Sequence, residues 1–140
     1  MNAQKIEIGP VGLIGLGLMG RGIASCLLAH GLEVVAYNRT SSRARASVRH
    51  IEETLEEMVR RRLLTRAGMR GWHNRFHLVR SIGELAPAGF VVESVKEELA
   101  LKRQIYDQLE AAVRDDAAVA SNTSSLPISA TASCTAGCAR

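Results

Sequence analysis

The chain has 140 residues, 46% hydrophobic and 23% charged, which is typical of one globular domain with its own core. The formal net charge is +4, and ten of the eighteen basic residues lie between Arg43 and Arg80, which favours an anionic partner. Only five residues are aromatic and none alternates with basic side chains, so we favour a phosphate-rich small molecule and predict no nucleic-acid partner. Arg21 and five glycines interrupt the apolar stretch Val11–Ala29, which argues against a membrane-spanning segment.

A strand, a glycine-rich turn, a helix and a second strand are predicted between Val11 and Tyr37. Val11–Ile14 and Val34–Tyr37 are short apolar runs typical of buried strands, and Arg21–His30 is compatible with a helix that ends at Gly31. The spacing fits one β-α-β unit, which is the context in which a G-x-G-x-x-G motif binds a dinucleotide.

The turn after the first strand carries this G-x-G-x-x-G motif. Its first glycine permits a tight turn, the second lets backbone approach a pyrophosphate, and the third lets the helix pack closely against the strand. Amides at the helix N-terminus would then face the phosphates with the positive end of the helix dipole. The alternative is a buried glycine-rich turn that binds no ligand. The predicted cofactor contacts here are Gly15, Leu16, Gly17, Leu18, Met19 and Gly20.

The rest of the chain alternates predicted helices and strands. Apolar residues three and four apart indicate helices, whereas short apolar or alternating runs indicate strands. The order predicts an α/β fold with a Rossmann-type, doubly wound, mostly parallel sheet, whose ligands bind beyond the carboxyl ends of the strands. The predicted elements are a helix over Arg43–Arg62, a short helix from Leu63, a strand over Phe76–Arg80, a helical turn over Ser81–Leu85, a strand over Phe90–Glu93, a helix over Glu97–Val113, a strand over Ala117–Ala120 and a polar loop over Ser121–Ser125.

The cysteines and histidines do not indicate a metal site. Cys134 and Cys138 have neither zinc nor redox spacing, and Cys26 is expected to be a small buried residue of the first helix. His73 and His77 lack a nearby acidic or cysteine ligand, so we predict that no metal is bound. With no export signal, a reducing cytoplasm is the expected compartment.

Four segments, taken together, resemble the N-terminal NAD-binding domain of the 3-hydroxyacyl-CoA dehydrogenase family. They are Val11–Ala24, Ile51–Leu55, Val91–Leu99 with Lys102, and Ala120–Leu126. The resemblance runs from Val11 to Ala130, and its last motif is the most specific. It implies an oxidoreductase that transfers hydride between the 3-hydroxyl carbon of an acyl-CoA and a nicotinamide cofactor, NAD in this family, in fatty-acid or hydroxybutyryl-CoA metabolism.

The resemblance also implies roles for individual residues. Thr54 and Arg61 match positions that contact CoA, and the basic run Arg60–Arg62 suits CoA phosphates, although a solvated helix end explains it equally well. Ser124 matches the residue between the nicotinamide and the substrate oxygen, and is the predicted catalytic contact. The further cofactor contacts implied are Glu97, Lys102, Asn122 and Ser124 itself.

The residue after the second strand departs from the family. The family usually has Asp there, which bonds the adenosine ribose, whereas this chain has Asn38 followed by Arg39. Asn does not repel a 2′-phosphate, and Arg39 is able to pair with one, so NADP is a second cofactor hypothesis beside NAD. Tyr37–Thr40 is similar to NADP-linked β-hydroxyacid dehydrogenases, which are the alternative enzyme family.

The end of the chain is the second departure. We expect a dinucleotide-binding domain over residues 1–130 and a disordered tail over residues 131–140 that is unlike the family. The family's catalytic His and its C-terminal helical domain lie beyond the matching segment, so we expect a truncated chain that is inactive by itself. A non-catalytic nucleotide-binding module is the alternative outside enzymes, and domain surface left exposed would favour self-association.

Overall fold

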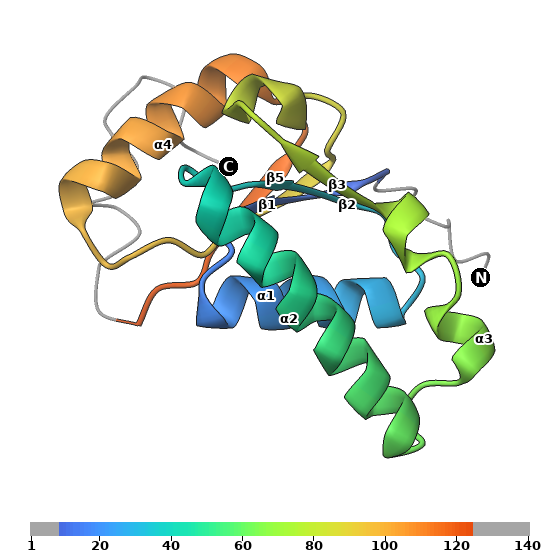
Figure 1. The fold of residues 1–140 in the computed structure, drawn as a ribbon. Coiled ribbons are helices and arrows are strands. Elements are labelled where there is room, and N and C mark those ends of the chain that lie inside the picture. Colours follow the sequence, from blue (N-terminus) through green and yellow to red (C-terminus); the bar gives the residue numbers. More distant parts are fainter. Residues whose placement is uncertain (1–8, 125–140) are drawn as a thin grey trace.

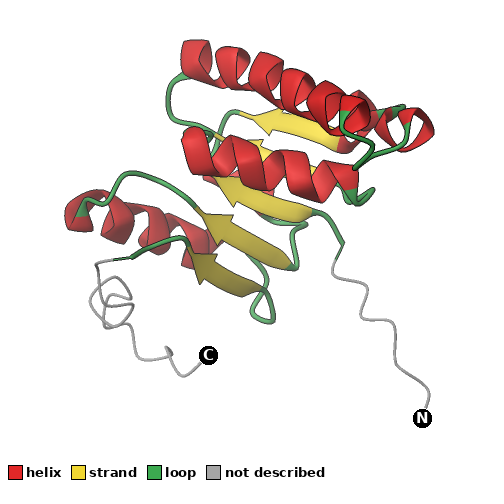
Figure 2. Cartoon of the chain, turned by 90° about the horizontal axis from the view of Figure 1, so that it is seen from below, coloured by secondary structure: helices red, strands yellow, loops and turns green. Residues whose placement is uncertain are grey.

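Five short strands form one sheet in the computed structural model, which describes residues 9–124. Every pairing is parallel, as Figure 2 shows from the common direction of the arrows, and the strand order is β3-β2-β1-β4-β5. The order reverses between β1 and β4, and a doubly wound sheet binds ligands at such a reversal. The strands are β1 (Val11–Ile14), β2 (Val34–Tyr37), β3 (Phe76–Val79), β4 (Phe90–Glu93) and β5 (Ala118–Ser121).

Helices cover both faces of the sheet (Figure 1). α1 and α2 pack against each other on one face, whereas α4 and the short η2 pack on the other. The predicted Rossmann-type, doubly wound α/β fold is therefore confirmed. The helical elements are α1 (Leu18–Ala29), α2 (Ser41–Arg60), α3 (Arg66–Met69) and α4 (Leu99–Ala112), with 3-10 turns η1 (Trp72–Arg75) and η2 (Ile82–Leu85).

The central strand β1 links two hydrophobic cores. All four of its residues are buried, because both faces of a parallel sheet are covered. Successive side chains alternate between the faces, so Leu13 packs into the core beneath α1 and α2 and Ile14 packs into the core beneath α4 and η2. The sheet therefore holds the loops after β1 and β4 side by side.

Several predicted boundaries and one predicted burial were wrong. α1 begins at Leu18, because Gly17 is its N-cap, and α4 begins at Leu99, because Glu98 keeps an extended backbone. Glu97 therefore lies in a loop and not in the first helical turn. Cys26 is exposed on α1, not buried, because Ala24 and Leu28 carry the buried face and Cys26 is two residues from each.

Two further points concern the limits of the described range. Of the helices within residues 9–124, none combines the length and apolar character needed to cross a membrane. The expected disordered tail at 131–140, like Cys134 and Cys138, lies outside the described residues.

Candidate functional site

The three motif glycines occupy three different environments. Gly15 has φ +92°, and a Cβ there would lie 2.4 Å from the Ser94 carbonyl oxygen of the neighbouring loop. A Cβ on Gly20 would lie 2.0 Å from the Gly15 carbonyl oxygen, so the helix start is packed directly onto the turn. A Cβ on Gly17 would meet nothing within 4 Å. Gly15 and Gly20 thus shape the turn, whereas Gly17 faces open space that a ligand is able to occupy.

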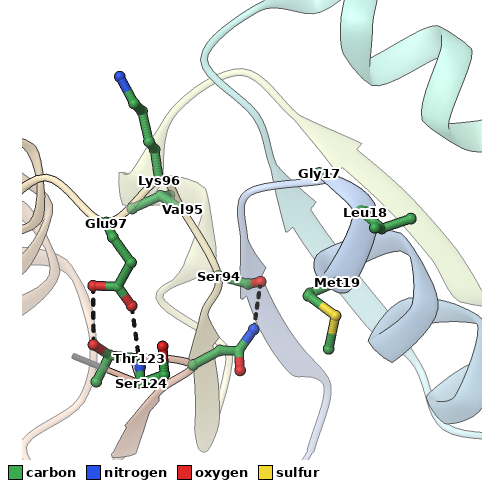
Figure 3. Close-up of a pocket in the computed structure, with 10 residues that line it drawn as sticks. Gly17, Leu18, Met19, Ser94, Val95, Lys96, Glu97, Thr123 and Ser124 are labelled. Carbon is green, nitrogen blue, oxygen red and sulfur yellow. Dashed lines mark hydrogen bonds between the residues drawn. The ribbon is translucent and has the colours of Figure 1, made fainter. Parts of the chain in front are cut away.

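Two adjoining cavities form one cleft over this turn. The first has a volume of about 520 Å³ and is lined by the start of α1 and by the loops after β4 and β5 (Figure 3). The second has a volume of about 460 Å³ and extends over the loop after β2. Both volumes are in the range of small-molecule sites. The two cavities share Gly17 and the loop residues Ser94, Val95 and Lys96, so the cleft passes directly over the glycine turn.

Asn38 holds the turn at the second cavity. Its Oδ1 accepts a hydrogen bond from the Leu16 amide at 3.1 Å, and its Nδ2 donates to the Thr40 carbonyl at 2.9 Å. Asn38 therefore lines the cavity without presenting a carboxylate. Arg39 and Arg43 line the same cavity, and neither forms an ion pair with another residue in the range 9–124.

Glu97 ties the loop after β5 to the first cavity. Its carboxylate accepts a hydrogen bond from the Thr123 hydroxyl at 3.0 Å and another from the Ser124 amide at 3.2 Å, and Figure 3 shows both. Asn122 donates from Nδ2 to the Ser94 hydroxyl at 3.2 Å, which joins the same loop to the one after β4. The structure thus brings Glu97, Asn122 and Ser124 together with the glycine turn.

A buried polar cluster lies beneath this cavity and was not predicted from the sequence. Glu93 and Lys102 are both fully buried, and the Lys102 ammonium donates to Glu93 Oε2 at 2.9 Å and to Oε1 at 3.2 Å. Glu93 also accepts hydrogen bonds from the Ser121 hydroxyl and the Val95 amide. Tyr106 hydrogen-bonds to Ser121, and burial is the main cause that raises the pKa of its phenol.

Lys102 therefore has a different environment from the one expected. It lines neither of the two cavities, and its ammonium lies 3.9 Å from Glu97 Oε1. The spacing of Lys102, Ile105 and Leu109 on the buried face of α4 was the available signal, because it places a lysine in an apolar stripe. A direct cofactor contact by Lys102 stays a prediction.

The residues matched to CoA contacts lie apart from the cleft. Thr54 donates its hydroxyl to the His50 carbonyl on α2, and Arg61 caps the end of that helix. Arg61 and Arg60 both bind the Glu57 carboxylate and lower its pKa, so the basic run is partly compensated. Neither Thr54 nor Arg61 lines the two cavities.

The histidines also lie outside the cleft. His50, His73 and His77 approach Glu53, Glu52 and Glu33, respectively, and His30 contacts the Cys26 carbonyl. None of them lines either cavity. Within the described residues there is also no group of three His, Cys, Asp or Glu side chains suited to a metal ion.

Comparison with protein families gives a match over almost the whole chain. Residues 10–140 match the model described as "3-hydroxyacyl-CoA dehydrogenase, NAD binding domain". A 3-hydroxybutyryl-CoA dehydrogenase of Bradyrhizobium diazoefficiens is 31% identical over 125 residues, which cover 89% of this chain and 43% of that protein. The human peroxisomal bifunctional enzyme is 30% identical over 133 residues, which cover 95% of this chain and 18% of that protein. The chain thus spans less than half the length of these relatives.

Solved structures agree with this match. The crystal structure of the 3-hydroxybutyryl-CoA dehydrogenase of Escherichia coli aligns with a TM-score of 0.84 and 31% identity, over 90% of this chain and 27% of that one. The (S)-3-hydroxybutyryl-CoA dehydrogenase of Ralstonia eutropha aligns with a TM-score of 0.80 and 30% identity, over 86% of this chain and 43% of that one.

Proposed function

The chain belongs to the 3-hydroxyacyl-CoA dehydrogenase family, as its NAD-binding domain, and from this premise we propose how its cleft holds a nicotinamide dinucleotide. The pyrophosphate lies over Gly17, where an added Cβ would meet no protein atom within 4 Å. The adenosine extends toward Asn38, because a residue at the end of the second strand contacts the ribose in this fold. The nicotinamide then occupies the first cavity, beside Glu97 and Ser124. The open space over Gly17, between two cavities of suitable size, is the observation that carries this proposal.

Calorimetric titration of the chain with oxidised and reduced dinucleotides tests the proposal. We expect one dinucleotide to bind per chain, with adenosine diphosphate ribose, which lacks the nicotinamide, binding more weakly. Absence of heat with all of NAD, NADH, NADP and NADPH would refute the cofactor site.

We further propose NAD as the cofactor, since the matching family model is that of an NAD-binding domain, with NADP as the second candidate. The Asn38 amide does not repel a 2′-phosphate as a carboxylate would, and two basic residues, Arg39 and Arg43, line the same cavity. Glu98 and Lys96 also line this cavity, but they lie 3.8 Å apart and compensate each other. Titration with NADH and NADPH under identical conditions decides the question, and equal or tighter binding of NADH would remove the argument for NADP.

The reaction that we propose for the complete enzyme is hydride transfer between C3 of an acyl-CoA and the nicotinamide. The nicotinamide supplies the hydride acceptor, and Ser124 hydrogen-bonds the substrate oxygen beside it. Proton removal from the hydroxyl needs a base near the reacting atoms, and the four histidines all lie outside the cleft. We therefore propose that this chain by itself has little or no activity with acetoacetyl-CoA and reduced cofactor. A normal turnover number would overturn that proposal.

The remaining alternatives keep the same cofactor site. Arg39 favours an NADP-linked β-hydroxyacid dehydrogenase, and histidines that lie away from the cleft favour a non-catalytic nucleotide-binding module. CoA binding by Thr54 and Arg61, self-association and a cytoplasmic location stay predictions from the sequence. Titration with CoA in the presence of cofactor tests the first of these.

A further inference from the structure

The charges around the two ends of the cleft differ in sign. Arg39 and Arg43 make the adenosine end cationic, whereas the nicotinamide end has only two charged side chains in its lining, Lys96 and Glu97, among the described residues. Lys96 is paired with Glu98, and Figure 3 shows its side chain extending away from the Glu97 carboxylate. Glu97 is therefore the charge that faces the nicotinamide end.

The buried cluster below does not neutralise Glu97. Lys102 contributes one positive charge between two carboxylates, at 2.9 Å from Glu93 Oε2 and 3.9 Å from Glu97 Oε1. Glu93 and Lys102 are both fully buried and compensate each other through the closer contact, which leaves one negative charge on Glu97. Hydrogen bonds from Thr123 and Ser124 hold that carboxylate at the cavity wall.

The nicotinamide ring changes charge when it accepts hydride. The oxidised ring carries one positive charge, and addition of a hydride, which brings two electrons and one proton, makes it neutral. A fixed negative charge beside the ring therefore stabilises the oxidised form and has little effect on the reduced form. The magnitude of this difference increases where protein replaces water around the charges.

From this arrangement we propose that Glu97 stabilises the oxidised, cationic nicotinamide relative to the reduced, neutral one, so that it sets the redox selectivity of cofactor binding. This inference rests on the cofactor site proposed above. Glu97 would thus have an electrostatic role in addition to its hydrogen bonds with the loop over residues 122–124.

The test measures dissociation constants of both redox forms of whichever couple, NAD or NADP, the wild-type chain binds more tightly. Glu97→Gln removes the charge and keeps the shape and one acceptor, so we expect the ratio of the oxidised to the reduced constant to rise by about three- to tenfold. A tenfold rise corresponds to an increase of about 30 mV in the potential of the bound two-electron couple. Glu53→Gln is the matched control, since it makes the same charge change on α2, at a residue that lines neither cavity, and its ratio should change less than about twofold.

Glu97→Asp separates charge from loop position. It keeps the charge but shortens the side chain, so it should weaken the binding of both redox forms alike. The ratio of the two dissociation constants should stay within about twofold of the wild-type ratio. If Glu97→Gln also weakens the binding of both forms equally, or if Glu53→Gln shifts the ratio as much as Glu97→Gln does, the electrostatic role is refuted. If the wild-type chain binds neither form of either couple, the cofactor site itself is refuted.

Discussion

Gly17→Ala separates the stability of the glycine turn from its ability to bind a dinucleotide. Gly17 has φ −69°, which suits alanine, and its added Cβ would meet no protein atom within 4 Å. The free energy of unfolding should therefore fall by less than about 1 kcal/mol, mainly through the weaker N-cap. The same Cβ would occupy the space into which we place the pyrophosphate. Loss of one amide hydrogen bond to a charged phosphate costs about 1.5–3 kcal/mol, so cofactor affinity should fall at least about tenfold.

The matched control is Gly20→Ala in the same motif. Its Cβ would lie 2.0 Å from the Gly15 carbonyl oxygen, so the helix must move and the cost should be about 1–3 kcal/mol of stability or more. Thermal unfolding followed by circular dichroism and calorimetric titration of the cofactor give both quantities for each variant. The reasoning is refuted if Gly17→Ala binds as tightly as wild type, or if it unfolds as easily as Gly20→Ala.

Three further predictions follow from the charged and exposed side chains. Lys102→Met leaves the buried Glu93 carboxylate without its cation and should lower the free energy of unfolding by about 3–5 kcal/mol. The double variant Lys102→Met with Glu93→Gln should recover part of that loss in a denaturant titration. If the free-energy changes of the two single substitutions simply add in the double variant, the pairing is contradicted. Arg39→Ala should lower the affinity for NADPH at least about tenfold and the affinity for NADH less than about twofold, as measured by fluorescence titration. Equal losses of affinity for the two cofactors would exclude a 2′-phosphate contact. Cys26 should react with a thiol reagent in the folded chain without loss of cofactor affinity, and protection from the reagent would contradict its exposure.

The sheet was predictable because its signals are local. Parallel strands that are buried on both faces read as continuous apolar runs, and Val11–Ile14 is such a run with all four residues buried. The roles of Gly15 and Gly20 were also predictable, since the motif fixes the spacing between strand, turn and helix. The exposure of Cys26 was predictable in principle, because the residue is two positions from Ala24 and from Leu28 on the helix. Its burial was instead predicted from the small, apolar character of the cysteine side chain.

The buried cluster was not predictable in the same way. Its residues come from three elements: Glu93 from β4, Lys102 from α4 and Ser121 from β5. They meet only in the folded chain, where β5 pairs with β4 and α4 brings Lys102 to Glu93. A lone Glu at the end of an apolar strand gives no indication of which cation it binds. Glu97 was identified by resemblance, but its contacts with Thr123 and Ser124 depend on the same tertiary arrangement.

A crystal structure of the chain with its tighter-binding dinucleotide tests the account most directly. We predict the pyrophosphate over Gly17, the adenosine ribose beside Asn38 and Arg39, and the nicotinamide in the cavity lined by Glu97 and Ser124. A dinucleotide bound in the reverse direction, or electron density for it anywhere other than over the glycine turn, would contradict the account.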